Sequence, residues 1–260
     1  MVEVSSHADP VSEVVDSFIG RTLTGSRPLF LVGGGGFGSD LVTAVNGEVI
    51  QHYGAVPPNV KFCAFDVMPV PKSVTLPGGR IIQLEPGVEY LQLGRGCNPA
   101  LLRQRREEGR LDPELAELVD LQPGGHFARS LELGSEGERI FGALALRWSR
   151  NEVRRLITRA LTGIASVRPI ASNGEKPSEE APIVIIAASV AGGVGSAIAL
   201  PLAAEVRRAM RRLGMNVEAA TFVALLGLPE TFPITRMRLS NCIDVLRDFQ
   251  TVQEKGVIPS

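Results

Sequence analysis

Three glycine-rich stretches contain the residues whose types and spacing could do chemistry. They are Gly33–Asp40 (GGGGFGSD), Leu93–Asn98 (LGRGCN) and Ala191–Ala197 (AGGVGSA). Glycine lets backbone N–H groups approach a ligand closely, and the N-terminus of a helix carries partial positive charge. A glycine loop that opens a helix is therefore typical of phosphate binding. Taken alone, each loop is equally compatible with a tight turn in which glycine serves only close packing.

The segments around these loops predict the elements that position them. The apolar runs Pro28–Val32 and Ile183–Ile186 precede the first and third loops, and helical patterns follow both. Each order predicts a strand, a loop and a helix. A further strand is predicted over Val60–Val67. It ends near Asp66, whose carboxylate could contact a ribose or a metal-bound water, or could cap the next turn.

The alternation of strands and helices predicts an α/β fold with a three-layer, doubly wound, mainly parallel sheet. Further strands are predicted at Arg80–Leu84 and Val217–Leu226, and helices at 99–109, 112–119, 151–164, from the third loop to Leu213, and at 235–250. With strand order 3-2-1-4-5, the order reverses between the strands that carry the first and third loops, and ligands of such sheets bind at this reversal. Two glycine loops there, with Leu93–Asn98 beside them, predict a nucleotide held mainly by backbone groups.

The composition gives no indication of several classes of partner and of binding site. Apolar residues make up 44% of the 260 residues, aromatic residues 5%, and the net charge is −1. This balance indicates neither a nucleic-acid partner nor an anionic membrane surface. Cys63, Cys97 and Cys242 lie far apart, and neither they nor the histidines have the spacing of metal ligands. The start of the chain lacks a secretion signal, so we expect a cytoplasmic protein.

One uncharged stretch has to be weighed as a membrane span. Residues 181–204 contain no charged side chain, a length that would suffice to cross a bilayer. Their glycines and Pro201 fall where a buried strand must turn into a helix. We therefore predict a buried strand and helix here and no membrane span.

Four segments carry a resemblance to a known family. LVGGGGFGSDLV resembles the opening phosphate loop of the tubulin and FtsZ superfamily, and LGRGCNPAL resembles the FtsZ loop that senses the terminal phosphate. ASVAGGVGSAIALPLAAEV resembles the GGGTG(S/T)G tubulin loop with its helix. RLSNCIDVLRDF is similar to the helix that lies near the ribose and base. The likeness is greatest to the bacterial branch of tubulin-like proteins.

The resemblance also predicts the domain limits. It covers residues 28–250 as a nucleotide-binding domain, with a helical insertion at about 105–180 that is longer than in FtsZ. Residues 1–27 are expected to form an N-terminal arm, with a short helix around Val11–Ile19. Residues 251–260 are expected to form a tail at the edge of a fragment.

The family implies binding of a guanine nucleotide, GTP or GDP, with Mg²⁺ as a candidate companion ion. It also implies head-to-tail self-association, in which a second domain of one subunit completes the GTPase site of its neighbour. Transferred position by position, the resemblance predicts three groups of phosphate contacts and one nucleoside group. The α and β phosphates would meet Gly35, Gly36, Phe37, Gly38 and Ser39, the γ-phosphate Gly94, Arg95, Gly96 and Cys97, the β and γ phosphates Gly192, Gly193, Val194, Gly195 and Ser196, and the nucleoside Arg238 and Asn241.

Several positions depart from the family pattern. Ala191, Val194 and Ala197 stand where the tubulin loop has its first glycine, its threonine and its last glycine. The valine removes a hydroxyl that could bond a phosphate oxygen, a loss of about 1 kcal/mol or more if that oxygen is left unpaired. After Asp66 the chain lacks the further acid that FtsZ has there, which affects magnesium handling.

The expected catalytic loop is also missing. No acidic loop resembling NxDxxD occurs before Ser260, so this chain has no residues to polarise the water that attacks a neighbour's GTP. We therefore expect at most an incomplete GTPase, with no catalytic residue assigned. Its second domain would be supplied by another protein, and self-association of this chain would be weak.

Two other functions remain open. Gly33, Gly35 and Gly38 match the GxGxxG dinucleotide fingerprint, so one alternative is an NAD(P)-binding oxidoreductase with Asp66 on the ribose. Against it, the acid lies further along the chain than the roughly 20 residues usual for this fingerprint. The other alternative is a scaffolding protein that kept the fold and lost the nucleotide, which the changed third loop permits.

Overall fold

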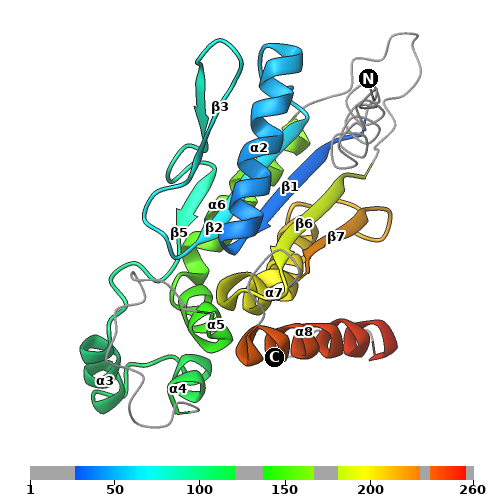
Figure 1. Ribbon diagram of the computed structural model, residues 1–260. Coiled ribbons are helices and arrows are strands. Elements are labelled where there is room, and N and C mark those ends of the chain that lie inside the picture. The colour runs from blue at the N-terminus through cyan, green and yellow to red at the C-terminus, as the bar shows by residue number, and fades with distance from the viewer. Residues whose placement is uncertain (1–26, 121–136, 167–180, 229–234, 256–260) are drawn as a thin grey trace, which may run out of the picture.

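The computed structural model describes residues 27–120, 137–166, 181–228 and 235–255, which form an α/β fold of three layers (Figure 1). Its elements in chain order are β1 (Leu29–Gly34), α2 (Gly35–Tyr53), β2 (Val60–Asp66), β3 (Ser73–Thr75), β4 (Ile81–Gln83), β5 (Tyr90–Gln92), α3 (Pro99–Glu107), α4 (Pro113–Asp120), α5 (Arg139–Trp148), α6 (Arg150–Ser166), β6 (Ile183–Ser189), α7 (Gly193–Arg212), β7 (Thr221–Gly227) and α8 (Arg236–Lys255). The short helix expected around Val11–Ile19 lies outside the described residues. None of the described helices is long and apolar enough to cross a membrane.

Five strands form one parallel sheet in the order β5-β2-β1-β6-β7. β1 lies at the centre, with β2 on one side and β6 on the other, and every neighbouring pair is parallel. The central strands are buried along almost their whole length, as parallel strands between two helical layers must be. The doubly wound α/β fold predicted from the sequence is confirmed. The strand order reverses between β1 and β6.

The prediction that Arg80–Leu84 forms the outer strand of this sheet is wrong. β4 pairs instead with β3 in a separate antiparallel hairpin, and Gly78 and Gly79 between them have positive φ. The outer strand of the main sheet is Tyr90–Gln92. Its 3 residues are too short a run for hydrophobic alternation to identify.

Other element limits also differ from the sequence pattern. α2 begins at Gly35, inside the glycine loop, and the last strand begins at Thr221, later than predicted. α5 begins at Arg139, within a stretch (124–142) whose glycines and charges favour irregular structure. α8 continues to Lys255, so the first part of the expected tail is helical.

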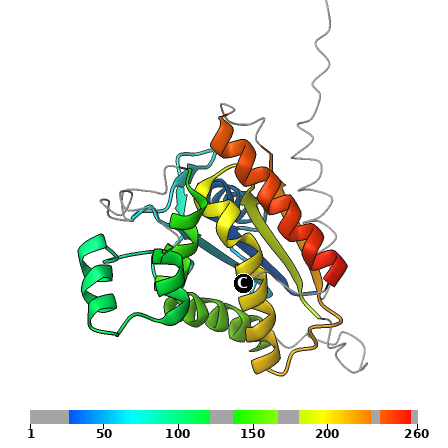
Figure 2. The ribbon, with the colours of Figure 1, turned by 90° about the horizontal axis from the view of Figure 1, so that it is seen from below.

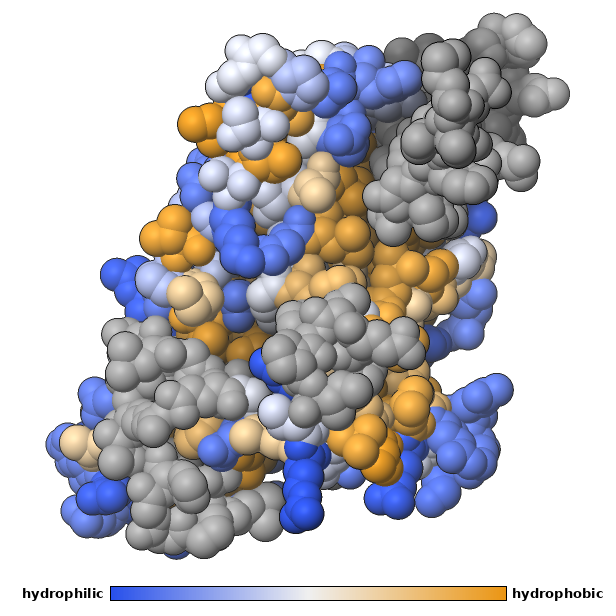
Figure 3. Space-filling model, viewed as in Figure 1, coloured by the Kyte–Doolittle hydropathy of each residue, from blue (hydrophilic) through white to orange (hydrophobic). Residues whose placement is uncertain are grey.

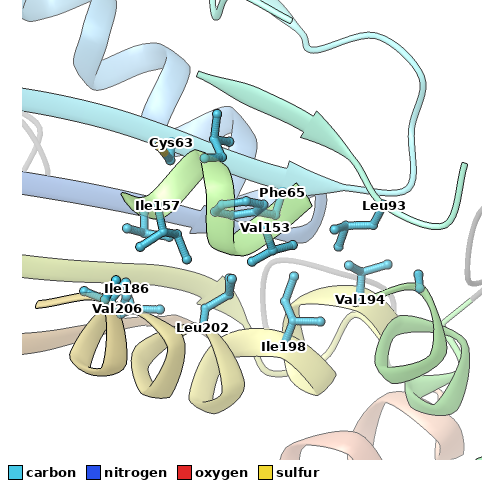
Figure 4. Packing of buried hydrophobic residues seen from close by; sticks show 14 of the residues in the cluster. Cys63, Phe65, Leu93, Val153, Ile157, Ile186, Val194, Ile198, Leu202 and Val206 are labelled. Atoms are coloured by element: carbon cyan, nitrogen blue, oxygen red, sulfur yellow. The ribbon is translucent and has the colours of Figure 1, made fainter. Parts of the chain in front are cut away.

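Helices cover both faces of the sheet and enclose two apolar cores. α2 packs on β1, β2 and β6 from one face, whereas α6 and α7 pack from the other, with α5 and α8 beside α7 (Figure 2). In the larger core Phe65, Val153 and Ile198 lie between the sheet and these helices (Figure 4). A smaller core under α2 contains Leu31 and Val42. Each fully buried side chain of this size contributes about 1.5–3 kcal/mol.

The glycines of the first and third loops bring strands and helices into backbone contact. A Cβ atom on Gly33 would lie 2.3 Å from Gly38 O, and one on Gly38 would lie 2.2 Å from Ala187 O. A Cβ atom on Gly35 would lie 2.6 Å from Gly195 N, so α2 and α7 begin in contact with each other. None of these positions has room for a side chain, whatever the loops bind.

A buried carboxylate ties α6 to α7. The side chain of Glu205 is 8% exposed, and its oxygens lie 3.4, 3.1 and 2.8 Å from nitrogens of Arg150, Arg154 and Arg208. Burial alone would raise the pKa of this carboxyl, but the hydrogen bond from Arg154 and the charges of the three arginines outweigh it and lower the pKa. Glu205 is therefore ionised at neutral pH and anchors both helices.

The substitution Gly38→Ala is expected to lower the free energy of unfolding by about 1–3 kcal/mol or more, because the added methyl group must displace the Ala187 carbonyl. Gly36→Ala on the same helix is the matched control, since the nearest atom to its Cβ would be 3.8 Å away. The control should be neutral or slightly stabilising, because alanine favours helix over glycine. Urea unfolding followed by circular dichroism measures both, and equal losses would contradict the packing role of Gly38.

Candidate functional site

Two helices begin side by side at the carboxyl edge of the sheet. β1 ends at Gly34 and α2 begins at Gly35, while β6 ends at Ser189 and α7 begins at Gly193. Neither helix has a side-chain hydrogen bond at its N-cap, and neither has an acidic residue in its first turn. The partial positive charges of both helix starts therefore lie together where the strand order reverses, and no side chain of either helix's own N-cap or first turn neutralises them.

The first glycine loop has one open glycine. Gly36 is exposed, and a Cβ atom there would meet nothing closer than Asp66 Oδ2. Phe37 is half-buried, with its ring against the last residue of β7. Gly38 and Ser39 are buried within the first turns of α2. The residues predicted for the α and β phosphates thus share one helix start, with Gly36 as its accessible member.

The third glycine loop is held by hydrogen bonds from the strand before it and from α8. Ser189 Oγ accepts hydrogen bonds from Ala191 N at 3.2 Å and from Gly192 N at 3.3 Å. Gly192 itself is half-buried, and its nearest non-neighbouring atom would lie 3.8 Å from an added Cβ. From α8, the Asn241 amide donates to Ala191 O at 3.3 Å. The loop conformation is therefore defined by protein contacts alone.

The first turn of α7 lies under α5. Gly193, Val194, Gly195 and Ser196 are all buried, and a Cβ atom on Gly142 of α5 would lie 2.8 Å from Gly193 O. Val194 belongs to the larger core, so the residue that replaces a family threonine fills an apolar position (Figure 4). Ser196 Oγ donates to Gly193 O at 3.2 Å, which engages its hydroxyl within the helix.

The two nucleoside candidates lie on neighbouring turns of α8. Asn241 is buried, and besides Ala191 O its amide bonds Gly137 O at 2.7 Å, so it joins α8 to two other segments. Arg238 is half-buried, and its backbone N–H donates to Thr235 Oγ1 at 3.2 Å. The structure thus brings Asn241 to the third glycine loop.

Asp66 supplies a buried acid at the same edge. It is 5% exposed, and its Oδ1 accepts a hydrogen bond from Val67 N at 2.8 Å. Burial raises the pKa of Asp66 to about 6, with the Val67 bond and Lys72 opposing and the charge of Asp40 adding to the rise. Lys72 Nζ lies 2.6 Å from Asp40 Oδ2.

Two carboxylates near Gly36, those of Asp40 and Asp66, are candidates to bind a Mg²⁺ ion through its water ligands. Oδ1 of Asp40 is buried and has no hydrogen-bond partner among the described residues. Asp40 and Asp66 could therefore accept hydrogen bonds from the water ligands of a Mg²⁺ ion that arrives with a phosphate group. Within the described part of the chain, no group of three or more His, Cys, Asp or Glu side chains could hold a metal by itself.

The second loop follows β5 and is attached to the junction of α5 and α6. Gly94 N donates to Ser149 Oγ at 2.8 Å, and Trp148 Nε1 donates to Arg95 O at 3.0 Å. Arg95 is exposed, whereas Cys97 is fully buried in the larger core, where burial raises the pKa of its thiol. Backbone groups and the arginine are thus what this loop offers a ligand, since a buried neutral thiol is inert.

At three of the predicted glycines, Gly36, Gly96 and Gly192, an added Cβ atom would meet no atom closer than 3.8 Å. Sequence reasoning missed the two serines that fix the loops. For Ser189, the signal was a hydroxyl residue at the end of a buried strand and before the glycines. For Ser149 no local signal exists, because it lies 55 residues from its partner and comes from a helix junction.

No family model and no curated protein matches the sequence. Among solved structures, the chain is similar to a mutant of FtsZ from M. jannaschii, with a TM-score of 0.42 and 13% identity over 92% of this chain and 47% of that one. It is similar to CetZ from Methanosaeta thermophila strain DSM 6194, with a TM-score of 0.41 and 14% identity over 87% of this chain and 43% of that one.

An empty FtsZ dimer from M. jannaschii gives similar values, with a TM-score of 0.41 and 13% identity over 92% of this chain and 46% of that one. This chain therefore spans less than half the length of each of these proteins. At such identity the likeness concerns the outline of the fold and assigns no role to any residue. What stands on the geometry alone is a parallel α/β sheet with two helix starts at its reversal point.

Proposed function

We propose that this protein binds a nucleotide by its phosphate groups at the starts of α2 and α7. One observation carries the proposal: two helices of 19 and 20 residues begin in contact at the reversal of strand order, and neither has a side-chain bond at its N-cap or an acidic residue in its own first turn. Each helix start contributes about half a positive charge and several backbone N–H groups without helical partners. An anion bound there interacts with both, which is the usual basis of phosphate binding in such sheets.

The starts of α2 and α7 contribute unequally to the proposed phosphate contacts. At α7, Ser189 already accepts the Ala191 and Gly192 N–H groups, and the next residues are buried under α5. At α2, Gly36 is exposed and its surroundings are open. We therefore assign most phosphate contacts to the start of α2, with Gly192 approaching from the other side. Val194 is buried in the larger core, so the side chain at this position offers a phosphate no hydrogen bond.

The charge of Asp66 makes binding depend on a cation. Above about pH 6 the carboxylate is ionised close to Gly36 and repels a phosphate chain. Mg²⁺ offsets this repulsion by placing a positive charge between the carboxylates and the phosphates. The base preference for guanine rests on the sequence resemblance to the tubulin and FtsZ superfamily, as does the expectation that a second domain from another protein completes any GTPase site.

Nucleotide should raise the melting temperature of the purified chain, most with GTP or GDP plus Mg²⁺. A ligand at about 100 times its Kd adds about 2.7 kcal/mol to the free energy of unfolding. Gly192→Asp should abolish the rise without lowering stability, because an N-cap aspartate is compatible with the helix and places a negative charge where Gly192 approaches the phosphate. Ala44→Asp, exposed on α2, adds the same charge elsewhere and should retain the rise.

Each alternative predicts a different thermal-shift result. A rise with NADH and not with GTP would favour the oxidoreductase, and no rise with any nucleotide would favour a nucleotide-free scaffold. The first result contradicts the preference for guanine, and the second contradicts nucleotide binding itself. A rise that survives Gly192→Asp unchanged contradicts the proposed site, since the ligand would then bind elsewhere.

Asp66→Asn should stabilise the protein at pH 7.5 by on the order of 2–3 kcal/mol and have little effect at pH 4. Folding raises the pKa of Asp66 from 3.8 to about 6. The folded protein therefore binds the proton of this carboxyl more tightly than the unfolded chain does. Stability contributed by this proton is present at low pH and is lost as the pH rises through 6. Urea unfolding at both pH values measures the difference.

Asp112→Asn is the control of opposite sign. Desolvation of Asp112 is outweighed by hydrogen bonds from Arg147 and from the backbone, so the pKa of Asp112 is lowered. Its substitution should cost stability at pH 7.5 and less at low pH. If the Asp66→Asn protein is no more stable than wild type at pH 7.5, ionisation of Asp66 in the folded protein costs no free energy, contrary to the expectation.

A further inference from the structure

Among the described residues, no helix covers an apolar strip of the sheet beside α2. α2 packs on β1, β2 and β6, whereas β7 makes extensive contact, within the described residues, only with β6. Val223 of β7 packs with the core under α2, and Leu225, two residues on, faces the same side and is 40% exposed. We call these two residues, with the half-buried Ile183 and Val45, the β7 strip. Figure 3 shows apolar surface between α2 and β7 on this side.

The chain enters the fold at one end of the β7 strip. Arg27 directly precedes β1, and its guanidinium donates to Ala181 O at 3.1 and 3.2 Å and to Thr221 Oγ1 at 3.2 Å. Thr221 is the first residue of β7, and its side chain faces the same side as Val223 and Leu225 because side chains alternate along a strand. The Arg27 side chain therefore lies at one end of the strip.

The segment before Arg27 contains apolar residues at the spacing of one face of a short helix. Apolar residues follow the i, i+3, i+4, i+7, i+8 spacing of one helix face, at Val11, Val14, Val15, Phe18 and Ile19. The positions between them are polar, namely Ser12, Glu13, Asp16 and Ser17. An isolated helix of this length is marginal in water, so the pattern needs an apolar surface to fold against.

We propose that Val11–Ile19 forms a helix that docks on the β7 strip, beside α2. Residues 20–26 link it to Arg27 and span roughly 23 Å when extended, which matches the length of the 7 residues of β7. The link is thus long enough to lay the helix along the whole strip. The tether also gives the arm a high effective concentration at the strip, which favours it over a second copy of the chain.

The test is limited proteolysis of the full chain with a glutamate-specific protease. Glu13 lies inside the proposed helix, and Glu3 lies outside the pattern in the same arm as an internal reference. In wild type, cleavage after Glu13 should be slower than after Glu3 by on the order of tenfold, because cleavage follows the population of the undocked state. Leu225→Asp should abolish the difference. Leu246→Asp, a leucine of α8 that is 54% exposed, is the matched control and should preserve it.

A second pair of variants tests the arm itself. Phe18→Asp should release the protection of Glu13, whereas Ser17→Asp on the polar face should keep it. Melting temperatures verify that each variant is folded, which is expected because both leucines are already exposed. Equal cleavage after Glu13 and Glu3 in wild type would overturn the proposal, as would equal effects of Leu225→Asp and Leu246→Asp. Protection that falls on dilution, together with a dimer in sedimentation, would show that a second copy occupies the strip.

Discussion

The contact between the starts of α2 and α7 is the constraint on which the rest of the structure depends. β1 and β6 are neighbours in the sheet, so the helices that follow them must leave the same edge within one strand spacing of about 4.8 Å. At that separation their first turns touch, and only residues without a side chain fit at Gly35 and Gly195. The same contact places two positive helix ends at one point. Packing and electrostatics thus have a common origin.

The glycines of the two loops therefore divide into two groups with different causes. Gly33, Gly35, Gly38 and Gly195 are explained by close backbone contacts, and they would be needed in a protein that binds nothing. Gly36, by contrast, has open space beside it, and packing gives no reason for a glycine there. A glycine count in the sequence cannot separate these groups, because the separating distances are between elements. A ligand can approach the backbone only at positions such as Gly36, where the neighbouring elements leave room.

At this edge, protein groups bond and cover the start of α7, whereas the start of α2 has an exposed residue, Gly36. The hydroxyl of Ser189, the amide of Asn241 and the helix α5 all engage the loop before α7. The start of α2 meets the buried acid Asp66 instead, whose raised pKa records the cost of keeping a carboxylate there. Burial is the main cause of this cost, since a carboxylate beside a helix start is otherwise favoured by the partial positive charge of the helix end.

The amino-acid sequence by itself determined the order of strand, glycine loop and helix, the parallel doubly wound sheet, and the place where its order reverses. These follow from local signals, since apolar runs, helical periodicity and glycines act over a few residues. Tertiary structure decided what depends on distant partners. Tyr90–Gln92 is a strand because β2 offers it an edge, Ser149 reaches Gly94 across 55 residues, and Glu205 is buried because three arginines meet it. Such contacts leave no periodic trace in the chain, because each joins residues that only folding brings together.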